Sequence, residues 1–408
     1  MEPPLTRREF GAVAAAGLAG FALARGANAA PERATSPPAA LAYAGEAETA
    51  VAVHAVPRGG GEGATVAAVR SAAQAATDFS WLSRGDSVLL KPACNSGNAY
   101  PATTDPVALR TMIGLLKEKG AGRVIVADMS GVQFVRFSKD ERSGSTRALM
   151  ESAGMARAVI DAGAEIHAFE EAGWDGFFEA MPQAGDSWKG PLMLPAVLRE
   201  VDHVILMPRC SRHLLAGSTL ALKAAVGWWR HDSRLEYHRD AATFSEKTAD
   251  ANSVAEIRDK QRLVLTSATR VLTTFGPDEG YVLEPDQGIV LASEDLVSHD
   301  LLSAAWLLEG RRATPTEHKD GVFDDPNNSA LFVNAANRMI VRWLSGFGEM
   351  LRSESLTRYD LQTVWDDRVL RRAFQISGGV PRVQIADEKG TLPRQLHDDL
   401  QMAVTLPG

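Results

Sequence analysis

The sequence predicts an α/β fold with a mainly parallel sheet flanked by helices in Rossmann-like layers. Two observations support this prediction. Short β-branched runs alternate with helical stretches along most of the chain, which is typical of a parallel sheet covered on both faces. The chain has 408 residues, 45% of them hydrophobic, which is enough for a large buried core.

The elements follow one another in a regular order. The expected strands lie at 50–56, 87–91, 123–128, 165–169, 203–207, 262–266 and 288–292. The expected helices lie at 63–76, 105–119, 145–162, 218–229, 294–308 and about 329–350. The helix at 105–119 has the clearest start, because Asp105 can cap it and Pro106 suits the first helical position.

The first 29 residues have the pattern of a twin-arginine signal peptide. Arg7 and Arg8 precede an uncharged small-residue run at 11–24, and Ala27-Asn28-Ala29 resembles a cleavage site. We therefore expect the twin-arginine export machinery as a partner and the periplasm as the location. Residues 30–48 are expected to form a flexible leader, 49–310 the α/β domain, and 311–408 a loop plus a helical C-terminal extension packed on the main body.

Charge and hydropathy exclude two classes of partner. Removing residues 1–29 takes three basic and two acidic residues from totals of 43 and 51, which leaves 40 and 49, a net charge of −9. An acidic chain of this kind is not expected to bind nucleic acid. The run at 11–24 is short for a membrane span, and no later segment approaches the roughly 18 apolar residues that a span needs.

Three unusual loops follow predicted strands, where ligands bind in open parallel sheets. We expect substrate-binding residues in all three loops. The first loop contains Lys91 and Asn95, and the second contains Asp128 and Ser130. The third loop, 208–213, contains Arg209 and Arg212 together with Cys210 and His213.

The same segments carry a family resemblance. The run KPACNSGNAYPATTDP, the strand RVIVAD with MSG, VDHVILMPRCSRH leading into STLALKAAVG, and FGPDEG followed by GIVLASEDLVSHD resemble the uncharacterised DUF362 family over about 50–308. The resemblance implies an α/β fold. Some members carry a ferredoxin-like module, but Cys94 and Cys210 alone cannot supply the four thiolates of a usual iron–sulfur cluster. Ser211 stands where many relatives have a lysine.

Residues 208–240 form the most basic segment. They contain six Lys and Arg residues against three Asp and Glu residues, inside an acidic chain. Arginine forks suit carboxylate and phosphate, so we expect an anionic ligand here, with Lys223 and Arg230 added to the binding residues. The alternative is that these cations pair with the acidic remainder of the protein.

Thiol and imidazole side chains in this segment permit a transition-metal site. Its ligands would be Cys210, His213, His231 and His238, and Cys210, His213 and His238 are the candidate catalytic residues. The alternatives are a buried cysteine, hydrogen-bonded histidines, or a disulfide between Cys94 and Cys210. No other cofactor is indicated.

Carboxylates elsewhere have weaker indications. Glu170 and Glu171 could form an acid–base pair or belong to a solvated helix start. Asp278 and Glu279 lie in a tight turn and can face either solvent or the crevice. Asp300 is expected to be a helix cap or core partner rather than a catalytic residue.

Three functional classes are compatible with these features. The first is a periplasmic enzyme acting on a small anionic substrate, with metal assistance as an option. The second is a non-catalytic ligand- or metal-binding protein that uses the same crevice. The third is a structural partner of a membrane complex, which would expose apolar residues such as Trp343 and Phe347.

Overall fold

The computed structural model describes residues 41–357 and 360–407. The expected signal peptide and the first part of the expected leader lie outside these residues. The centre is an eight-stranded sheet. Its strands, in spatial order, are β16 (Val380–Ala386), β1 (Tyr43–Pro57), β15 (Gln287–Ser293), β12 (Gln261–Ala268), β9 (His203–Met207), β2 (Ser87–Pro92), β3 (Arg123–Asp128) and β6 (Glu165–Ala168).

The predicted mainly parallel sheet is confirmed. Strands β12, β9, β2, β3 and β6 are parallel neighbours, and β1 and β16 are parallel to each other. Strand β15 alone runs against both of its neighbours in this sheet. From β2 the chain adds β3 and then β6 toward one edge of the sheet. The later strand β9 lies on the other side of β2, so the direction in which strands are added reverses between β2 and β9.

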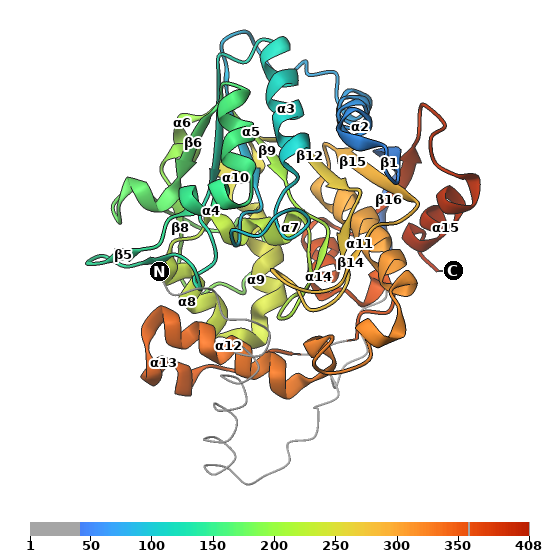
Figure 1. Cartoon of the computed structure of the whole chain (residues 1–408). Helices are drawn as coiled ribbons and strands as arrows, with labels where there is room; N and C mark the ends of the chain where they lie inside the picture. The colour runs from blue at the N-terminus through green and yellow to red at the C-terminus, as the bar shows by residue number, and fades with distance from the viewer. Residues whose placement is uncertain (1–40, 358–359, 408) are drawn as a thin grey trace.

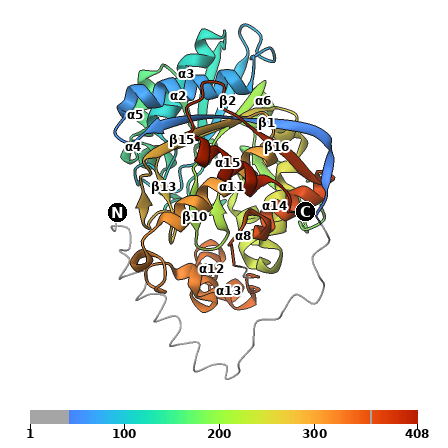
Figure 2. The ribbon, with the colours of Figure 1, turned by 90° about the vertical axis from the view of Figure 1, so that its right-hand side faces the viewer.

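Helices cover both faces of the sheet (Figures 1 and 2). One face packs on α2 (Gly61–Ala76), α3 (Pro106–Glu118), α4 (Thr146–Ser152) and α5 (Met155–Asp161). The other packs on α7 (Ala221–Ala224), α8 (His231–Arg239), α9 (Phe244–Asp250), α11 (Leu296–Ala313), α14 (Arg368–Ile376) and α15 (Arg394–Val404). Alternating side chains divide between the faces: Leu89 belongs to one core and its neighbours Val88 and Leu90 to the other.

Shorter elements connect these layers. The strands are β4 (Arg136–Phe137), β5 (Arg142–Ser143), β7 (Phe177–Ala180), β8 (Leu192–Pro195), β10 (Ser211–His213), β11 (Gly217–Thr219), β13 (Val271–Leu272) and β14 (Val282–Leu283). The helices are η1 (Phe169–Ala172), α6 (Val197–Glu200), η2 (Ala225–Trp228), η3 (Ala241–Thr243), η4 (Ala251–Ser253) and α10 (Ala255–Arg258). Strands β11, β10, β13 and β14 form a second, four-stranded sheet.

Two predicted helices are interrupted. The helix expected at 145–162 is two helices, because Gly154 between them has a φ of 79°. The helix expected at 218–229 begins as strand β11 and continues as α7 and η2. Only a short turn therefore carries Lys223.

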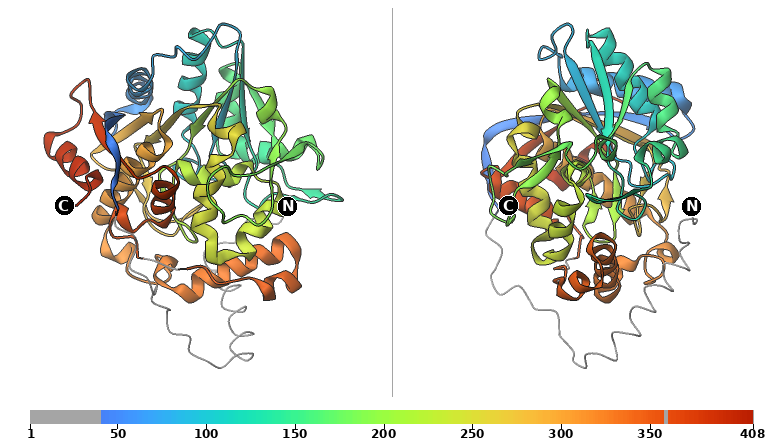
Figure 3. Two further views of the ribbon diagram at one scale, coloured as in Figure 1. Left: turned by 180° about the vertical axis from the view of Figure 1, so that it is seen from behind. Right: turned by 90° about the vertical axis from the view of Figure 1, so that its left-hand side faces the viewer.

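The C-terminal part contributes to both the sheet and its cover. It contains η5 (Thr316–His318), η6 (Pro326–Asn328), α12 (Ala330–Ser345), α13 (Phe347–Arg352) and η7 (Val364–Asp366) before α14, β16 and α15. Helices α12 and α13 lie on the side of α8 away from the main sheet (Figures 1 and 3). The expected helical extension thus also supplies edge strand β16, which pairs with β1. Strand β1 itself begins at Tyr43, inside the expected leader.

None of the helices in the described part of the chain combines the length and the apolar character needed to cross a membrane.

Candidate functional site

A cavity of about 170 Å³ lies beyond the carboxyl ends of β2 and β3. It is lined by side chains from the loops after these strands, from β10 and α7, from the turn at 275–279 and from helix α12. The reversal of strand order between β2 and β9 places it where open α/β sheets bind ligands. An engineered cavity of roughly 150 Å³ holds benzene, so this one suits a molecule of only a few non-hydrogen atoms.

A buried ion pair forms one part of the cavity wall. Lys91 Nζ lies 2.7 Å from Asp128 Oδ1 and donates to the carbonyl of Pro92 at 2.9 Å. Asp128 also accepts from the backbone N–H of Cys94 and of Met129, both at 2.8 Å. A Cβ on Gly227 would lie 2.4 Å from Lys91 Nζ, so only glycine lets η2 approach this pair. Both predicted residues line the cavity, with their charges satisfied by each other.

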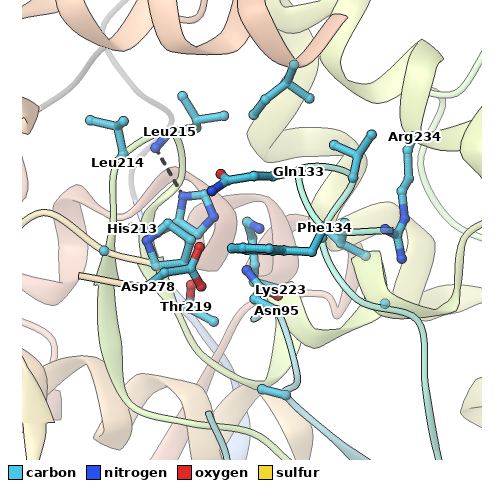
Figure 4. Close-up of a pocket in the computed structure, with 18 of the residues that line it drawn as sticks. Asn95, Gln133, Phe134, His213, Leu214, Leu215, Thr219, Lys223, Arg234 and Asp278 are labelled. Atoms are coloured by element: carbon cyan, nitrogen blue, oxygen red, sulfur yellow. Dashed lines mark hydrogen bonds between the residues drawn. The ribbon is translucent and has the colours of Figure 1, made fainter. Parts of the chain in front are cut away.

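Lys223 lines the same cavity without such a partner (Figure 4). Within the described residues its amine has neither a hydrogen bond nor an ion pair. Burial lowers its pKa from the ordinary value of 10.5 to about 7, and the positive charges of Arg209 and Arg234 contribute. The start of α7 is held by Asp300, whose carboxylate accepts from the N–H groups of Ala221 and Leu222 at 2.8 and 2.7 Å.

Arg209, behind this wall, is a second buried cation without a hydrogen-bond partner among the described residues. It is fully buried, and none of its three guanidinium nitrogens has a hydrogen-bond partner in the part of the chain that the structure describes. Asp278 is its strongest opposite charge, and burial raises the pKa of that carboxyl. Because a raised pKa favours the neutral acid, Asp278 offsets only part of the positive charge.

His213 faces the cavity as a neutral hydrogen-bond donor. Its Nδ1 accepts from the backbone N–H groups of Leu215 and Ala216 at 3.1 and 3.3 Å, so the ring proton is assigned to Nε2 (Figure 4). Burial, reinforced by Lys223 and Arg209, keeps the pKa of His213 well below its usual value. It therefore offers an N–H to a ligand and cannot act as a base through Nδ1.

His238 has the opposite tautomer. Its Nδ1 lies 2.8 Å from Asn337 Oδ1, and the Asn337 amide donates to the His238 carbonyl at 2.8 Å. The oxygen of that amide is thereby directed at Nδ1, which must carry the proton and leave Nε2 as an acceptor. Burial lowers the pKa of His238 to about 3. The cavity wall thus combines one imidazole donor with one imidazole acceptor.

Arg234 contributes charge and holds the wall together. Its guanidinium donates to the carbonyls of Trp229, Ser130 and Met129 at 2.9, 2.5 and 2.7 Å. Ser130, predicted to bind substrate, is buried beside the cavity, and its hydroxyl donates to the Cys94 carbonyl. Asn95 lies in the cavity wall as predicted.

The structure does not support a catalytic Cys210. The residue is absent from the cavity wall and belongs to the core under α11, where its thiol contacts the Ser303 carbonyl at 3.5 Å. Burial raises the pKa of the thiol, so little thiolate exists at neutral pH. Cys94 lies in the core on the opposite face of the sheet. Both cysteines are free thiols, and the alternative disulfide is not formed.

Three further predicted residues lie away from the cavity and have other contacts. Arg230 pairs with Asp232 at 2.7 Å and covers the ring of Trp174. His231 Nδ1 forms a hydrogen bond with the carbonyl of Phe137. Arg212 lines a separate, smaller pocket with Arg311.

The predicted metal site is therefore not assembled. Cys210 and His231 point to other parts of the molecule than His213 and His238. Among residues 41–357 and 360–407, no three His, Cys, Asp or Glu side chains are grouped as a metal ion requires.

Several cavity residues were not predicted as site residues. The sequence allows Asp278 to face either solvent or the crevice, and it indicates Arg234 only as one charge of the basic segment. Gln133 and Phe134 also line the cavity and lie two and three residues after the predicted second loop, 128–131. A longer loop in the prediction would have included both. Trp343 was considered only as a surface residue, but it lines the cavity from α12.

The weaker carboxylate indications resolve clearly. Glu170 is buried and accepts from the N–H and hydroxyl of Thr146 at 2.7 and 3.0 Å, and Glu171 pairs with Arg147 at 2.7 Å. Both contacts are structural. Asp300 caps the start of α7, as expected.

Comparisons with known proteins identify the family. Two solved structures show low similarity to this chain. A Thermotoga maritima protein has 13% identity and a TM-score of 0.37, and the match covers 57% of this chain and 56% of that one. The lactate racemase apoprotein from Thermoanaerobacterium thermosaccharolyticum has 12% identity and a TM-score of 0.35, and the match covers 56% of this chain and 52% of that one. The chain thus spans just over half the length of each. No curated protein matches it. The family model described as a domain of unknown function, DUF362, matches residues 88–305, more than half of the chain. The chain therefore belongs to the DUF362 family.

Proposed function

We propose that this chain is an exported enzyme that acts on a small anionic substrate bound in the cavity at the carboxyl ends of β2 and β3. The observation that carries the proposal is Lys223, whose amine lines the cavity without a protein partner.

Excess positive charge supports an anionic ligand. Lys91 and Asp128 cancel each other at 2.7 Å, and Asp278 has a raised pKa. The charges of Arg209, Arg234 and Lys223 remain, against the half-buried Glu279 at the wall. A buried cation without a partner is costly, and a bound carboxylate or phosphate would offset that cost. His213 adds an N–H donor for the same anion.

The titration of Lys223 supports catalysis over simple binding. A binding protein is best served by a permanently charged lysine. A pKa of about 7 instead leaves the amine about half neutral at neutral pH, which suits a group that exchanges protons or attacks a substrate. A non-catalytic binding protein is the alternative.

Anion-induced thermal stabilisation tests the proposal. Oxalate and phosphate, added separately, are expected to raise the melting temperature of the wild-type chain by a few degrees, since a ligand at 100 times its Kd contributes about 2.7 kcal/mol. Lys223→Met should lose most of this rise. Arg230→Met is the matched control, because Arg230 pairs with Asp232 outside the cavity, and it should keep the full rise.

The outcomes separate the two candidates. No stabilisation by any anion, or equal stabilisation of Lys223→Met and wild type, would contradict the proposed site. Stabilisation without turnover of any bound organic acid would favour the non-catalytic binding protein.

Export is the second part of the proposal and rests on Arg7 and Arg8 ahead of the small-residue run. Replacing both arginines with lysine should keep the protein in the cytoplasmic fraction of a host with a twin-arginine pathway. Unchanged recovery from the periplasm would contradict this route.

A further inference from the structure

The lysines near the cavity differ in what their amines contact. Lys91 Nζ lies 2.7 Å from Asp128 and donates to Pro92 at 2.9 Å. Lys247, also buried, lies 3.3 Å from Glu236 and 3.8 Å from Asp240. Burial lowers the pKa of both lysines, but these carboxylates oppose that effect and favour the charged form, whose nitrogen has no lone pair to share. Lys223 has no such contact within the described residues.

The position of Lys223 is also well fixed. The buried carboxylate of Asp300 caps the turn that carries Lys223 by accepting from the N–H groups of Ala221 and Leu222. Both of these residues are buried as well. An unpaired amine on a capped turn, lining a cavity beside other cations, has the arrangement of a covalent nucleophile.

We propose that Lys223 Nζ forms a Schiff base with a small carboxylic acid that carries an aldehyde or ketone group, such as a 2-oxo acid. This inference rests on the proposed function, since it names the substrate class and the reacting atom of the same site. The carboxylate would take the place of the missing counter-charge, and the carbonyl carbon would lie at Nζ.

The step balances without an oxidant or a further reactant. The Nζ lone pair attacks the carbonyl carbon, and the C=O π-electrons move onto the oxygen. That oxygen takes a proton from the nitrogen, which gives a carbinolamine. A second proton allows the C–O bond to break and water to leave as the nitrogen lone pair forms the C=N bond. The net reaction consumes one neutral amine, one carbonyl compound and one proton, and gives a protonated imine and one water.

Three cavity side chains suit this sequence of steps. Asp278 lines the cavity, and burial raises its pKa, which favours the protonated carboxyl that the second proton transfer requires. His213 can donate Nε2–H to the carbonyl oxygen while negative charge develops there. His238, with Nε2 as an acceptor, can bind a hydroxyl of the carbinolamine.

Reductive trapping tests the inference. The mature chain is incubated near pH 7.5 with pyruvate or glyoxylate, reduced with sodium borohydride, and analysed by intact mass and peptide mapping. The expected result is one adduct per chain, on the peptide that contains Lys223. Lys223→Arg should give no adduct, and Lys189→Arg, which alters an exposed lysine paired with Asp240, should label like the wild type.

The site mapping in the wild-type chain decides the question even if Lys223→Arg folds poorly. No adduct with either acid, or adducts spread over surface lysines, would overturn the inference. Stabilisation by oxalate or phosphate would then still support the anion site, because those anions have no carbonyl that a lysine can condense with. Loss of both results would remove the proposed function as well.

Discussion

Helix α8 with its N-cap Arg230 and the segment 209–223 both carry positive charge, but their charges have different surroundings. On α8, Arg230 pairs with Asp232, Arg239 pairs with Asp240, and Arg234 donates to three carbonyls. In the other segment, Arg209 and Lys223 have no hydrogen-bond partner in the described chain. The fold explains the cations of α8, but it does not explain the charges of Arg209 and Lys223.

This contrast separates structural charges from candidate functional ones. A satisfied buried charge helps to hold the fold, whereas an unsatisfied one costs free energy and persists where a ligand compensates for it. Arg209 and Arg234 form a nearly matched pair for testing this, because both are buried arginines near one cavity.

The largest expected effect is on stability. Arg234→Met removes three charge-assisted hydrogen bonds and leaves the carbonyls of Met129, Ser130 and Trp229 unpaired, so we expect a loss of about 4 kcal/mol in the free energy of unfolding. Arg209→Met removes a buried charge that makes no hydrogen bonds, so we expect stability to rise by about 1 kcal/mol. Urea denaturation of both variants measures the difference. Equal losses would mean that Arg209 is also a structural residue.

The fold was more predictable than the site. The strand at Arg123–Asp128 could be placed because β-branched periodicity is local, and the three loops could be placed because strand ends are local too. Partners are not local. Arg230 and Lys223 look alike in the sequence, and only the three-dimensional contacts show that one is paired and the other is not.

The same limit explains why the predicted metal ligands do not lie together in the described part of the chain. Cys210 and His213 are three residues apart, but His213 lies on the extended strand β10, where successive side chains point to opposite faces, so residues an odd number apart face different ways. Cys210 enters the core under α11, whereas His213 enters the cavity. Strand β16 was missed because a short edge strand in a helical tail has little periodicity of its own.

A smaller effect concerns the pH dependence of stability. The folded pKa of Lys223 is about 7 and its ordinary value is 10.5, so between these values the unfolded chain binds more protons. Wild-type stability should therefore rise with pH across this window, and the cost of the buried charge is fully present below pH 7. Lys223→Met should be more stable than wild type by about 2 kcal/mol at pH 6, since the residue is partly exposed. The gain should fade toward pH 10. A constant difference in thermal or urea unfolding would contradict the lowered pKa.

The most direct test of the central claim is the titration of Lys223 itself. Trace acetylation with acetic anhydride, followed by peptide mass spectrometry from pH 5.5 to 11, reports the neutral fraction of each lysine. Labelling of Lys223 is expected to be half-maximal near pH 7, whereas labelling of Lys189, whose pKa is raised by Asp240, should continue to increase above pH 10. A half-maximum for Lys223 near pH 10 would show an ordinary charged lysine and would contradict its assignment as the reactive group.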